Sequence, residues 1–414
     1  MSSLKPVRGT HDILPEESLR RRLVEKTADE VAARYGYGEI STPLFEFTDV
    51  FARTLGGSSD IVTKEMYTFE DRSGDSITLR PENTAGVARA LISNGLAQQL
   101  PLKFFYRGPM FRYERPQKGR LRQFHQVGVE LLGVAQPLAD VEVIAMAAQF
   151  LQALGVGGKT TLELNTLGDG ESRGAYRETL VEYLLGRKGE LSKESLERLE
   201  RNPLRILDSK DPGDRAVIKD APDMADSLND LSKRFFDELL EGLETAKVAY
   251  VLNPRLVRGL DYYCHSAFEF TTQELGAQGT VLAGGRYDGL IKQMGGPPTP
   301  GTGWAAGVER LAMLIAEPVE RRRPIAVIPV APGQAAPALA LAQQLRQAGF
   351  TVDLGYSGNM GKRMKRANKV NACAAVMLGE DELSRDAARV RDMDSGEQRE
   401  EPLASLEDHL ARYN

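Results

Sequence analysis

Residues 104–132 read FFYRGPMFRYERPQKGRLRQFHQVGVELL and predict two β-strands joined by a long polar loop. Both ends are apolar and rich in residues that favour strands, whereas the middle is charged. Gly119 predicts a turn inside the loop. Against the single acid Glu114, the loop holds the cations Arg112, Arg115, Lys118, Arg120 and Arg122. A loop that only connects two strands does not need so many positive charges, so this loop is expected to have a further role.

The second strand has two different faces, because side chains alternate along a strand. The face typical of a core holds His125, Val127, Val129 and Leu131. The other face holds Phe124, Gln126, Gly128 and Glu130. An amide and a carboxylate with a glycine between them predict a surface with room for a ligand. A solvent-facing sheet surface is the simpler alternative.

The composition is that of an ordinary globular chain. Its 414 residues indicate two or three domains, and 42% hydrophobic residues can fill sizeable cores. The net charge of -5 and the pI near 5.7 mean that contact with nucleic acid must come from local basic patches.

The two cysteines and the N-terminus predict a soluble, cytoplasmic protein. Cys264 and Cys373 are far apart and, with four scattered histidines, form no metal-ligand spacing. A reducing compartment fits this usage best. The N-terminus lacks the apolar core of a signal peptide, and the chain has no apolar run long enough to span a membrane.

The first half of the chain predicts helices and strands in alternation. Residues 15–36 predict an amphipathic helix, 39–51 a strand, 55–63 a mobile glycine-rich loop, 66–80 a β-hairpin and 140–154 a helix. Asn83 or Thr84 is expected to cap a helix that runs to about Ala97, which places Glu82 at a helix N-terminus suited to a ligand amine or phosphate. Residues 153–160 resemble a P-loop, but they follow a helix and have Ala153 in place of the first glycine, so we reject a phosphate site there.

The second half predicts an insertion and a separate C-terminal domain. Residues from about 170 to 246 are charged and leucine-rich, which indicates a helical insertion. Strand character returns from 248 to 272 and again around 280–310, and a boundary falls near 320–324. Beyond it, strands and helices alternate, which indicates a small α/β domain. A helix expected at 360–371 bears a cationic stripe at one-turn spacing, either a solvated face or an RNA contact: Lys362, Lys365, Arg366 and Lys369.

Unusual polar content in the large domain falls in four segments: 80–84, 112–130, 256–263 and 284–310. If 256–263 is extended, Arg258, Leu260 and Tyr262 share a face. In the last segment a glycine-rich strand leads into a helix bearing Arg310, and its glycines allow close approach to a flat ring.

Three arginines from separate segments, Arg112, Arg258 and Arg310, would be costly to bury together unless anions neutralise them. A triphosphate supplies such anions. Phosphoryl or nucleotidyl transfer fits this set, because guanidinium groups position phosphates and spread developing charge.

Four motifs, found in order, resemble those of the class II aminoacyl-tRNA synthetases and specifically of the histidyl-tRNA synthetase family. Residues 111–126, FRYERPQKGRLRQFHQ, are similar to the second class-defining motif, and 301–311, GTGWAAGVERL, to the third. LVRGLDYY at 256–263 and AGGRYD at 283–288 resemble the two motifs peculiar to the histidine enzymes. Asn83 stands where glycine is expected and Tyr113 where histidine is common. Neither departure removes an expected ligand-binding group.

The resemblance implies activation of L-histidine by ATP to histidyl-adenylate, followed by transfer to the 3′ end of tRNA(His). It implies that Arg112 holds the α-phosphate and Arg310 the γ-phosphate, and that Phe124 stacks on adenine. Arg258 would stabilise the α-phosphorus during attack by the histidine carboxylate. The implied receivers of the α-amino group are Glu82, Thr84 and Gln126. The implied imidazole pocket, a polar and two-sided one, comprises Glu130, Tyr262 and Tyr287, with Tyr263 also at the histidine site.

The resemblance also implies partners and a fold. The acceptor end of the tRNA would meet the loop residues Arg115, Gln117, Arg120 and Arg122, and the stripe on 360–371 would lie in an anticodon-binding domain. The implied fold is α+β: a six- or seven-stranded antiparallel sheet with flanking helices and the helical insertion in a catalytic domain, 1–322, and an α/β domain at 323–414. A homodimer is expected. So is Mg²⁺ beside ATP, with no ligands predicted.

Two other functions remain open to the sequence. One is the histidine-binding regulatory subunit of ATP phosphoribosyltransferase, although such proteins typically lack the C-terminal domain and depart at positions such as Arg258. The other is a class II synthetase for proline or threonine, which would not be expected to have LVRGLDYY.

Overall fold

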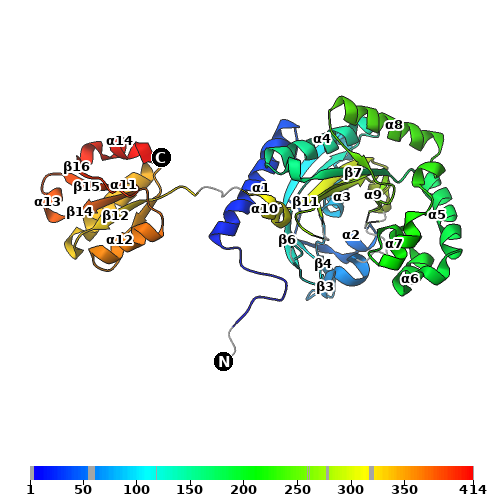
Figure 1. Ribbon diagram of the computed structural model, residues 1–414, viewed down its shortest axis with the longest axis horizontal. Helices are drawn as coiled ribbons and strands as arrows, with labels where there is room; N and C mark the ends of the chain where they lie inside the picture. The colour runs from blue at the N-terminus through cyan, green and yellow to red at the C-terminus, as the bar shows by residue number, and fades with distance from the viewer. Residues whose placement is uncertain are drawn as a thin grey trace. The chain divides into compact units, whose positions relative to one another are not determined.

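The computed structural model describes residues 4–54, 61–117, 119–258, 260, 262–276, 279–316 and 321–413. The chain divides into two compact units, Met1–Pro318 and Val319–Asn414. Figure 1 shows a large sheet flanked by helices in the first unit and a smaller sheet with helices in the second. No helix among the described residues has the length and apolar character needed to cross a membrane.

The large sheet has eight strands in the order β1-β5-β6-β11-β10-β9-β7-β8. Their bounds are β1 Gly38–Glu39, β5 Leu102–Phe111, β6 Gln123–Leu132, β7 Thr161–Thr166, β8 Val251–Leu252, β9 Cys264–Thr271, β10 Thr280–Arg286 and β11 Gly301–Gly307. The six inner strands are antiparallel, as expected. The sheet is wider than expected because the short edge strands β1 and β8 each pair in parallel with a neighbour.

The β5–β6 hairpin confirms the two faces predicted for residues 123–132. Val127, Val129 and Leu131 are buried in the main core. That core is closed by four helices: α1 Pro15–Arg34, α4 Pro137–Ala153, α8 Asp230–Thr245 and α10 Val308–Leu314. Phe150 of α4 stacks on Trp304 of β11 with ring centres 5.7 Å apart.

The opposite face of the sheet has two rows of mostly short residues in register, and larger side chains of the same unit approach them closely. One row across β6, β11 and β10 is Gly128, Ala305 and Ala283, and the next is Glu130, Gly303 and Gly285. Over this face lie α2 Thr48–Ala52, α3 Thr84–Ser93 and α9 Leu290–Gln293. A three-stranded sheet in the order β2-β4-β3 belongs to the same unit: β2 Phe45–Phe47, β3 Tyr67–Glu70 and β4 Ser76–Leu79.

The predicted helical insertion is present, and side chains cap its helices. It consists of α5 Gly170–Leu185, α6 Lys193–Arg201, α7 Pro212–Lys219 and α8, joined by short 3₁₀ turns. Each N-terminus has a capping acceptor of the preferred type: Asp169, Ser192, Asp211 and Asn229. Inside the insertion, Asp214 accepts hydrogen bonds from the hydroxyls of Ser192, Ser195 and Ser209.

The second unit is the predicted small α/β fold. Its sheet has the order β13-β12-β14-β15-β16, with β12 Ile325–Pro329, β13 Val352–Leu354, β14 Ala374–Leu378, β15 Ala387–Asp392 and β16 Gln398–Pro402. Four helices accompany it: α11 Ala335–Gln347, α12 Met360–Lys369, α13 Glu380–Leu383 and α14 Leu406–Leu410. The strand β16 was not predicted, because its charged, exposed sequence shows no apolar alternation.

Several local predictions were wrong. Residues 39–51 form two short strands and the helix α2, not one strand. Between 253 and 263 no described residue is in a strand, so Arg258, Leu260 and Tyr262 do not share a strand face. The helix α3 ends at Ser93 and not near Ala97, and Gly95 with φ +63° starts a 3₁₀ turn. Most of the loop predicted at 55–63 lies outside the described residues.

Asp140 joins three strands from beneath the sheet. Its carboxylate, fully buried on α4, accepts hydrogen bonds from Ser266 of β9, Arg286 of β10 at 2.9 Å and Thr302 of β11 at 3.2 Å. The Arg286 guanidinium is also fully buried, so this ion pair is shielded from water.

Asp140→Ala is expected to lower the free energy of unfolding of the first unit by about 3–5 kcal/mol, because it leaves the Arg286 charge buried without its main partner. Urea denaturation followed by tryptophan fluorescence measures this unit alone, since Trp304 is the only tryptophan of the chain. Asp237→Ala on the exposed face of α8 is the control, with a change of about 0.5 kcal/mol or less. Similar losses in both variants would contradict the prediction.

Candidate active site

The carboxylate of Glu82 organises the corner between β4 and α3. It accepts hydrogen bonds from the backbone N–H groups of Thr84 at 2.6 Å and Ala85 at 2.9 Å. The helix is therefore capped by Glu82, not by Asn83 or Thr84 as predicted. The Asn83 side chain instead accepts from Thr42 at 2.6 Å and from Arg80 at 3.2 Å. Burial raises the pKa of Glu82 above its usual value.

Glu130 lies at the centre of a pocket of tyrosines on the open face of the sheet. Its buried carboxylate accepts hydrogen bonds from the Thr84 hydroxyl at 2.7 Å and from the Tyr287 hydroxyl. The Tyr262 ring lies 4.6 Å from the Tyr263 ring and 5.8 Å from the Tyr287 ring, centre to centre. Burial raises the pKa of Glu130 to about 8. Within the described part of the chain, neither Glu82 nor Glu130 forms a salt bridge.

Glycines make this pocket possible, although not quite as predicted. A side chain at Gly303 would collide with the Glu130 carboxylate, and one at Gly301 with the Tyr287 ring. Gly128 does not leave its space to a ligand, because the Tyr106 ring end lies 2.4 Å from where a β-carbon would stand. The flat rings that approach these glycines belong to the protein itself.

Gln126 provides a free polar group on this face of β6. It lies on the same face of β6 as Glu130, four residues away. Its side-chain oxygen is buried and has no hydrogen-bond partner among the described residues. Such an acceptor beside two carboxylates suits a ligand that brings several N–H donors.

Arg112 and Phe124 lie together at the far end of β5 and β6. The Arg112 guanidinium is 5.3 Å from the centre of the Phe124 ring, and its Nε donates to the Pro81 carbonyl at 2.9 Å. Pro81 directly precedes Glu82, so the contact ties the Arg112 position to the Glu82 corner.

Arg258 lies between the Tyr263 ring and strand β9 of the large sheet. Its guanidinium is 5.2 Å from the Tyr263 ring centre and forms a short ion pair with Glu269 of β9. Burial acts to lower the pKa of Arg258, but Tyr263 and Glu269 raise it above its usual value. Glu269 was not predicted, because nothing in its strand sequence sets it apart.

Arg310 is the least satisfied of the three arginines. Its Nε and one terminal nitrogen are buried without a hydrogen-bond partner among the described residues. Burial and the charge of Arg120 lower its pKa, whereas Glu269 and Glu114 act in the opposite direction. A buried cation held beside another cation is a strong site for an anion.

Shared carboxylates link the three arginines. Glu269 forms an ion pair with Arg258, and its negative charge also acts to raise the pKa of Arg310. The charge of Glu114 likewise acts to raise the pKa of Arg310. The Glu114 carboxylate lies 4.0 Å from the guanidinium of Arg112 and 3.0 Å from that of Arg120. Segments far apart in the sequence therefore bring their guanidinium groups to one region of the sheet.

The loop between β5 and β6 covers this region. Gly119 has φ +73°, as its predicted turn requires, and lies against the Arg310 side chain. Arg115 and Gln117 are exposed, whereas Arg120 pairs with Glu114. Arg122 stacks on Tyr113 at 3.8 Å and donates to the Glu114 carbonyl at 3.2 Å. Lys118 lies outside the described residues.

Sequence reasoning also missed a link between the two expected phosphate-binding segments. The His125 backbone N–H donates to Glu309 at 2.9 Å, and the His125 ring nitrogen lies 2.7 Å from the same carboxylate. Because His125 follows Phe124 and Glu309 precedes Arg310, the pair fixes β6 against α10.

The rejected P-loop segment forms a 3₁₀ turn at Gly157–Lys159, and its lysine donates to the Leu314 carbonyl at 2.9 Å.

The predicted cationic stripe is on α12 of the second unit, and its four residues are exposed: Lys362, Lys365, Arg366 and Lys369. The Arg366 guanidinium is not available to a ligand, because it forms a bidentate ion pair with Asp353 at 2.7 and 2.8 Å. The three lysines provide the available charge of this surface.

Comparisons with known proteins agree over the full chain. The family model described as histidyl-tRNA synthetase matches residues 9–311, and that of an anticodon binding domain matches 324–413. A curated histidine–tRNA ligase of Rhodospirillum rubrum is 66% identical over 414 residues and is covered completely, as is this chain. The crystal structure of apo Staphylococcus aureus histidyl-tRNA synthetase matches with TM-score 0.82 and 35% identity, covering 98% of this chain and 99% of that one. A Bacillus halodurans structure titled as an ATP phosphoribosyltransferase regulatory subunit/histidyl-tRNA synthetase shares the fold, with TM-score 0.64 and 23% identity, covering 88% of this chain and 97% of that one.

Proposed function

The chain belongs to the histidyl-tRNA synthetase family, and from that premise we propose how its residues divide the reaction. The enzyme uses ATP to activate L-histidine and transfers the histidyl group to tRNA(His). A regulatory histidine-binding subunit is not favoured, because the relative that matches over its full length is named as a ligase and the anticodon-binding unit is present.

One observation supports the assignment of the nucleotide site most strongly: two guanidinium nitrogens of Arg310 are buried without a hydrogen-bond partner among the described residues, near Arg120, Glu269 and Glu114. We assign the γ-phosphate to Arg310 and the α-phosphate to Arg112. The adenine ring would stack on Phe124, which already lies against the Arg112 guanidinium. Phosphate oxygens would satisfy groups that are costly to leave unpaired.

The histidine side of the site follows from the two buried carboxylates. The α-ammonium group would lie among Glu82, Thr84 and Gln126. The imidazole would bind between Glu130 and the tyrosines Tyr262, Tyr263 and Tyr287. A ring with a donor and an acceptor on opposite edges can satisfy such a pocket, whereas an apolar analogue leaves buried groups unpaired.

Arg258 stands between these two halves. The histidine carboxylate attacks the α-phosphorus of ATP, a new C–O–P link forms, and the bond to pyrophosphate breaks. Negative charge grows on the α-phosphate oxygens, and Arg258 would neutralise it from a fixed position. The protein needs no nucleophile of its own, because the substrate carboxylate attacks directly.

Mg²⁺ remains part of the proposal as a companion of the nucleotide. Among the described residues no group of three or more His, Cys, Asp or Glu side chains could hold a metal ion. Mg²⁺ bound with a nucleotide is usually held mainly by phosphates and water. Glu114 and Glu269 are carboxylates near the arginines that could add a ligand. Bound Mg²⁺ would neutralise phosphate charge.

We propose that tRNA(His) contacts both units. The exposed Arg115 and Gln117, with Arg120 and Arg122 behind them, would meet the acceptor end, and the lysines of α12 would meet the anticodon arm. The cytoplasmic location expected from the sequence stays a prediction.

Replacing Lys362, Lys365 and Lys369 together by glutamate is expected to raise the KM for tRNA(His) by about ten-fold or more, because lost phosphate contacts weaken binding. Histidine-dependent ATP–pyrophosphate exchange should be unchanged, since α12 takes no part in activation. Aminoacylation at several salt concentrations measures the first effect and exchange the second. The same triple reversal at the exposed Arg20, Arg22 and Lys26 of α1 is the control. An unchanged KM for tRNA would refute the assignment of α12, and absence of exchange with histidine in the unaltered enzyme would refute the function.

We also propose that the three-stranded sheet binds a second copy of the chain. Its two cross-strand rows are apolar on one face: Phe47, Ile77 and Phe69, and Phe45, Leu79 and Tyr67. Phe45, Phe47 and Phe69 are 57%, 59% and 49% exposed. An exposed apolar face of this kind indicates an interface, and the homodimer implied by the sequence resemblance supplies its occupant.

Phe47→Asp combined with Phe69→Asp is expected to convert the dimer to monomers of 45.5 kDa, because two buried carboxylates would oppose association. Sedimentation velocity at micromolar concentration measures the mass. Arg72→Asp, at the turn between β3 and β4, adds negative charge nearby but off the apolar face and should leave the dimer intact. Equal masses for both variants would contradict the proposed interface.

A further inference from the structure

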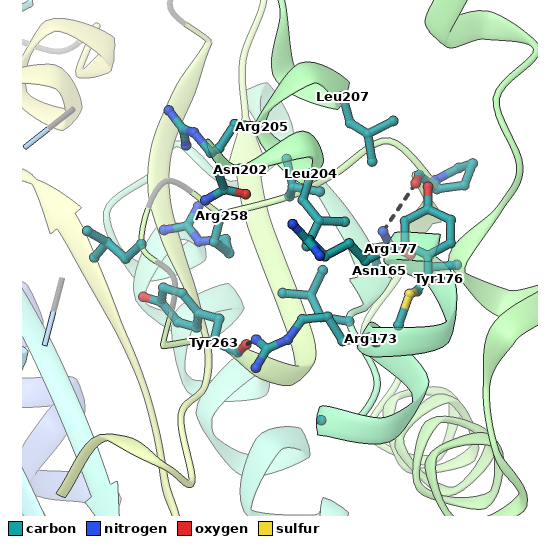
Figure 2. A pocket seen from close by; sticks show the side chains of 17 residues that line it. Asn165, Arg173, Tyr176, Arg177, Asn202, Leu204, Arg205, Leu207, Arg258 and Tyr263 are labelled. Carbon is teal, nitrogen blue, oxygen red and sulfur yellow. Dashed lines mark hydrogen bonds between the residues drawn. The ribbon is translucent and has the colours of Figure 1, made fainter. Parts of the chain in front are cut away.

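A cavity of about 350 Å³ lies beside the active site, between the helical insertion and the large sheet (Figure 2). Its lining comes from α5 and the 3₁₀ turn Pro203–Asp208 on one side, and from the stretch around Pro254 to Arg258 on the other. Arg258 and Tyr263 line both this cavity and the site described above. The roles proposed for histidine and ATP leave the rest of the cavity unused.

The described residues that line the cavity carry positive charge and no carboxylate. Their guanidinium groups are those of Arg173, Arg177, Arg205 and Arg258. Figure 2 shows Arg173 and Arg177 extending from α5, with Arg173 donating to the Tyr263 carbonyl at 2.6 Å. Arg173 and Arg177 are one helical turn apart, a spacing at which like charges repel. The Arg177 side chain is solvent-exposed and has no hydrogen bond or ion pair with any described residue.

The rest of the wall is mostly apolar. Its residues include Leu167, Leu204, Leu207, Met224, Val257 and Leu260. The volume falls in the range of small-molecule pockets, which typically combine an apolar lining with few polar groups. A ligand with several anionic groups would place charge against the leucines, whereas a neutral ligand would leave Arg177 unpaired. The lining therefore suits one anionic group attached to an aromatic or aliphatic body.

We propose that this cavity is a second ligand site, specific for small aromatic or aliphatic monoanions, and that it is coupled to histidine binding through Arg258 and Tyr263. A ligand in the cavity touches two side chains that also face the substrates. Any ligand that shifts them changes histidine affinity, and histidine changes the affinity of that ligand by the same factor. The binding part of this proposal is independent of the roles assigned to the active site.

The probe is 2-naphthoate, which has one carboxylate on a fused apolar ring system. Isothermal titration of the full-length enzyme is expected to show saturable binding at one site. Arg177→Glu should weaken it about ten-fold or more, since it reverses the unpaired charge. Leu204→Trp should also weaken it, because it fills the cavity. The neutral 2-naphthamide and the ringless acetate should each bind much more weakly than 2-naphthoate.

Arg201→Glu is the matched control, because Arg201 is exposed on α6 and does not line the cavity. It should bind 2-naphthoate like the unaltered enzyme. Pyrophosphate exchange by Arg177→Glu without probe should be normal, which shows that the variant is folded. Absence of binding, or equal affinities for the unaltered enzyme, Arg177→Glu and Leu204→Trp, would overturn the site. Equal affinities with and without saturating histidine would overturn the coupling.

Discussion

Replacing Arg258 with alanine is expected to slow histidine activation by about 100- to 1,000-fold while histidine binding largely survives. The guanidinium lies between the Tyr263 ring and Glu269, on the boundary of the histidine and ATP halves that we propose for the site. From there it can oppose the charge that grows on the α-phosphate. An interaction that strengthens in the transition state affects kcat more than substrate affinity.

The kinetics of ATP–pyrophosphate exchange give kcat and the KM values, and equilibrium dialysis gives histidine affinity without ATP. Glu269→Gln is the informative control, because it removes the ion-pair partner but keeps the guanidinium. It should lose far less activity than Arg258→Ala. Trp304 fluorescence during urea denaturation checks that both variants fold. Parallel losses of kcat and histidine affinity in Arg258→Ala would mean that Arg258 holds the ground state instead.

The alternation of side chains along a strand and the sequence motifs predicted which residues of the candidate site share a face or a region. The alternation along 123–132 placed Gln126 and Glu130 on one face and Val127 and Val129 in the core, because one residue of shift would reverse both faces. The motifs around Arg112, Arg258 and Arg310 predicted that these arginines lie in one region. In the structure the carboxylates of Glu269 and Glu114 lie near them and connect them. The roles of these residues stay predictions until they are measured.

What the sequence could not provide is the set of contacts made across strands. Glu269 and Asp140 are ordinary acids in ordinary elements, and only the strand order brings them to Arg258 and Arg286. Likewise, a glycine at position 128 indicates that another group approaches the strand closely there. Only the β5–β6 register shows that this group is the Tyr106 ring. Segment 256–263 was expected to be extended, but none of its described residues is in a strand.

Glu130→Gln is expected to weaken histidine binding by about 100-fold, because an amide replaces the buried carboxyl group that lines the proposed imidazole pocket. The Thr84 and Tyr287 hydroxyls donate to this carboxylate, so the amide also disturbs the groups that shape the pocket. The KM for ATP should change little, since the arginines are untouched. Titration calorimetry with histidine measures the first effect and exchange kinetics the second. Glu163→Gln, on β7 of the same sheet, is the control and should bind histidine normally.

The same variant should alter how stability depends on pH. Burial raises the pKa of Glu130 from 4.5 to about 8, so between these values the folded chain holds a proton that the unfolded chain has released. This contribution to stability is complete below pH 4.5 and is lost as the pH rises toward 8, by up to about 1.4 kcal/mol per pH unit. Glutamine does not titrate, so Glu130→Gln should flatten the decline of the unfolding free energy between pH 6 and pH 8, measured by urea denaturation with Trp304 as reporter. If the curves of the variant and the unaltered enzyme run parallel, Glu130 is already ionised in the free enzyme. The pocket would then hold a permanent negative charge and would favour histidine with a protonated imidazole.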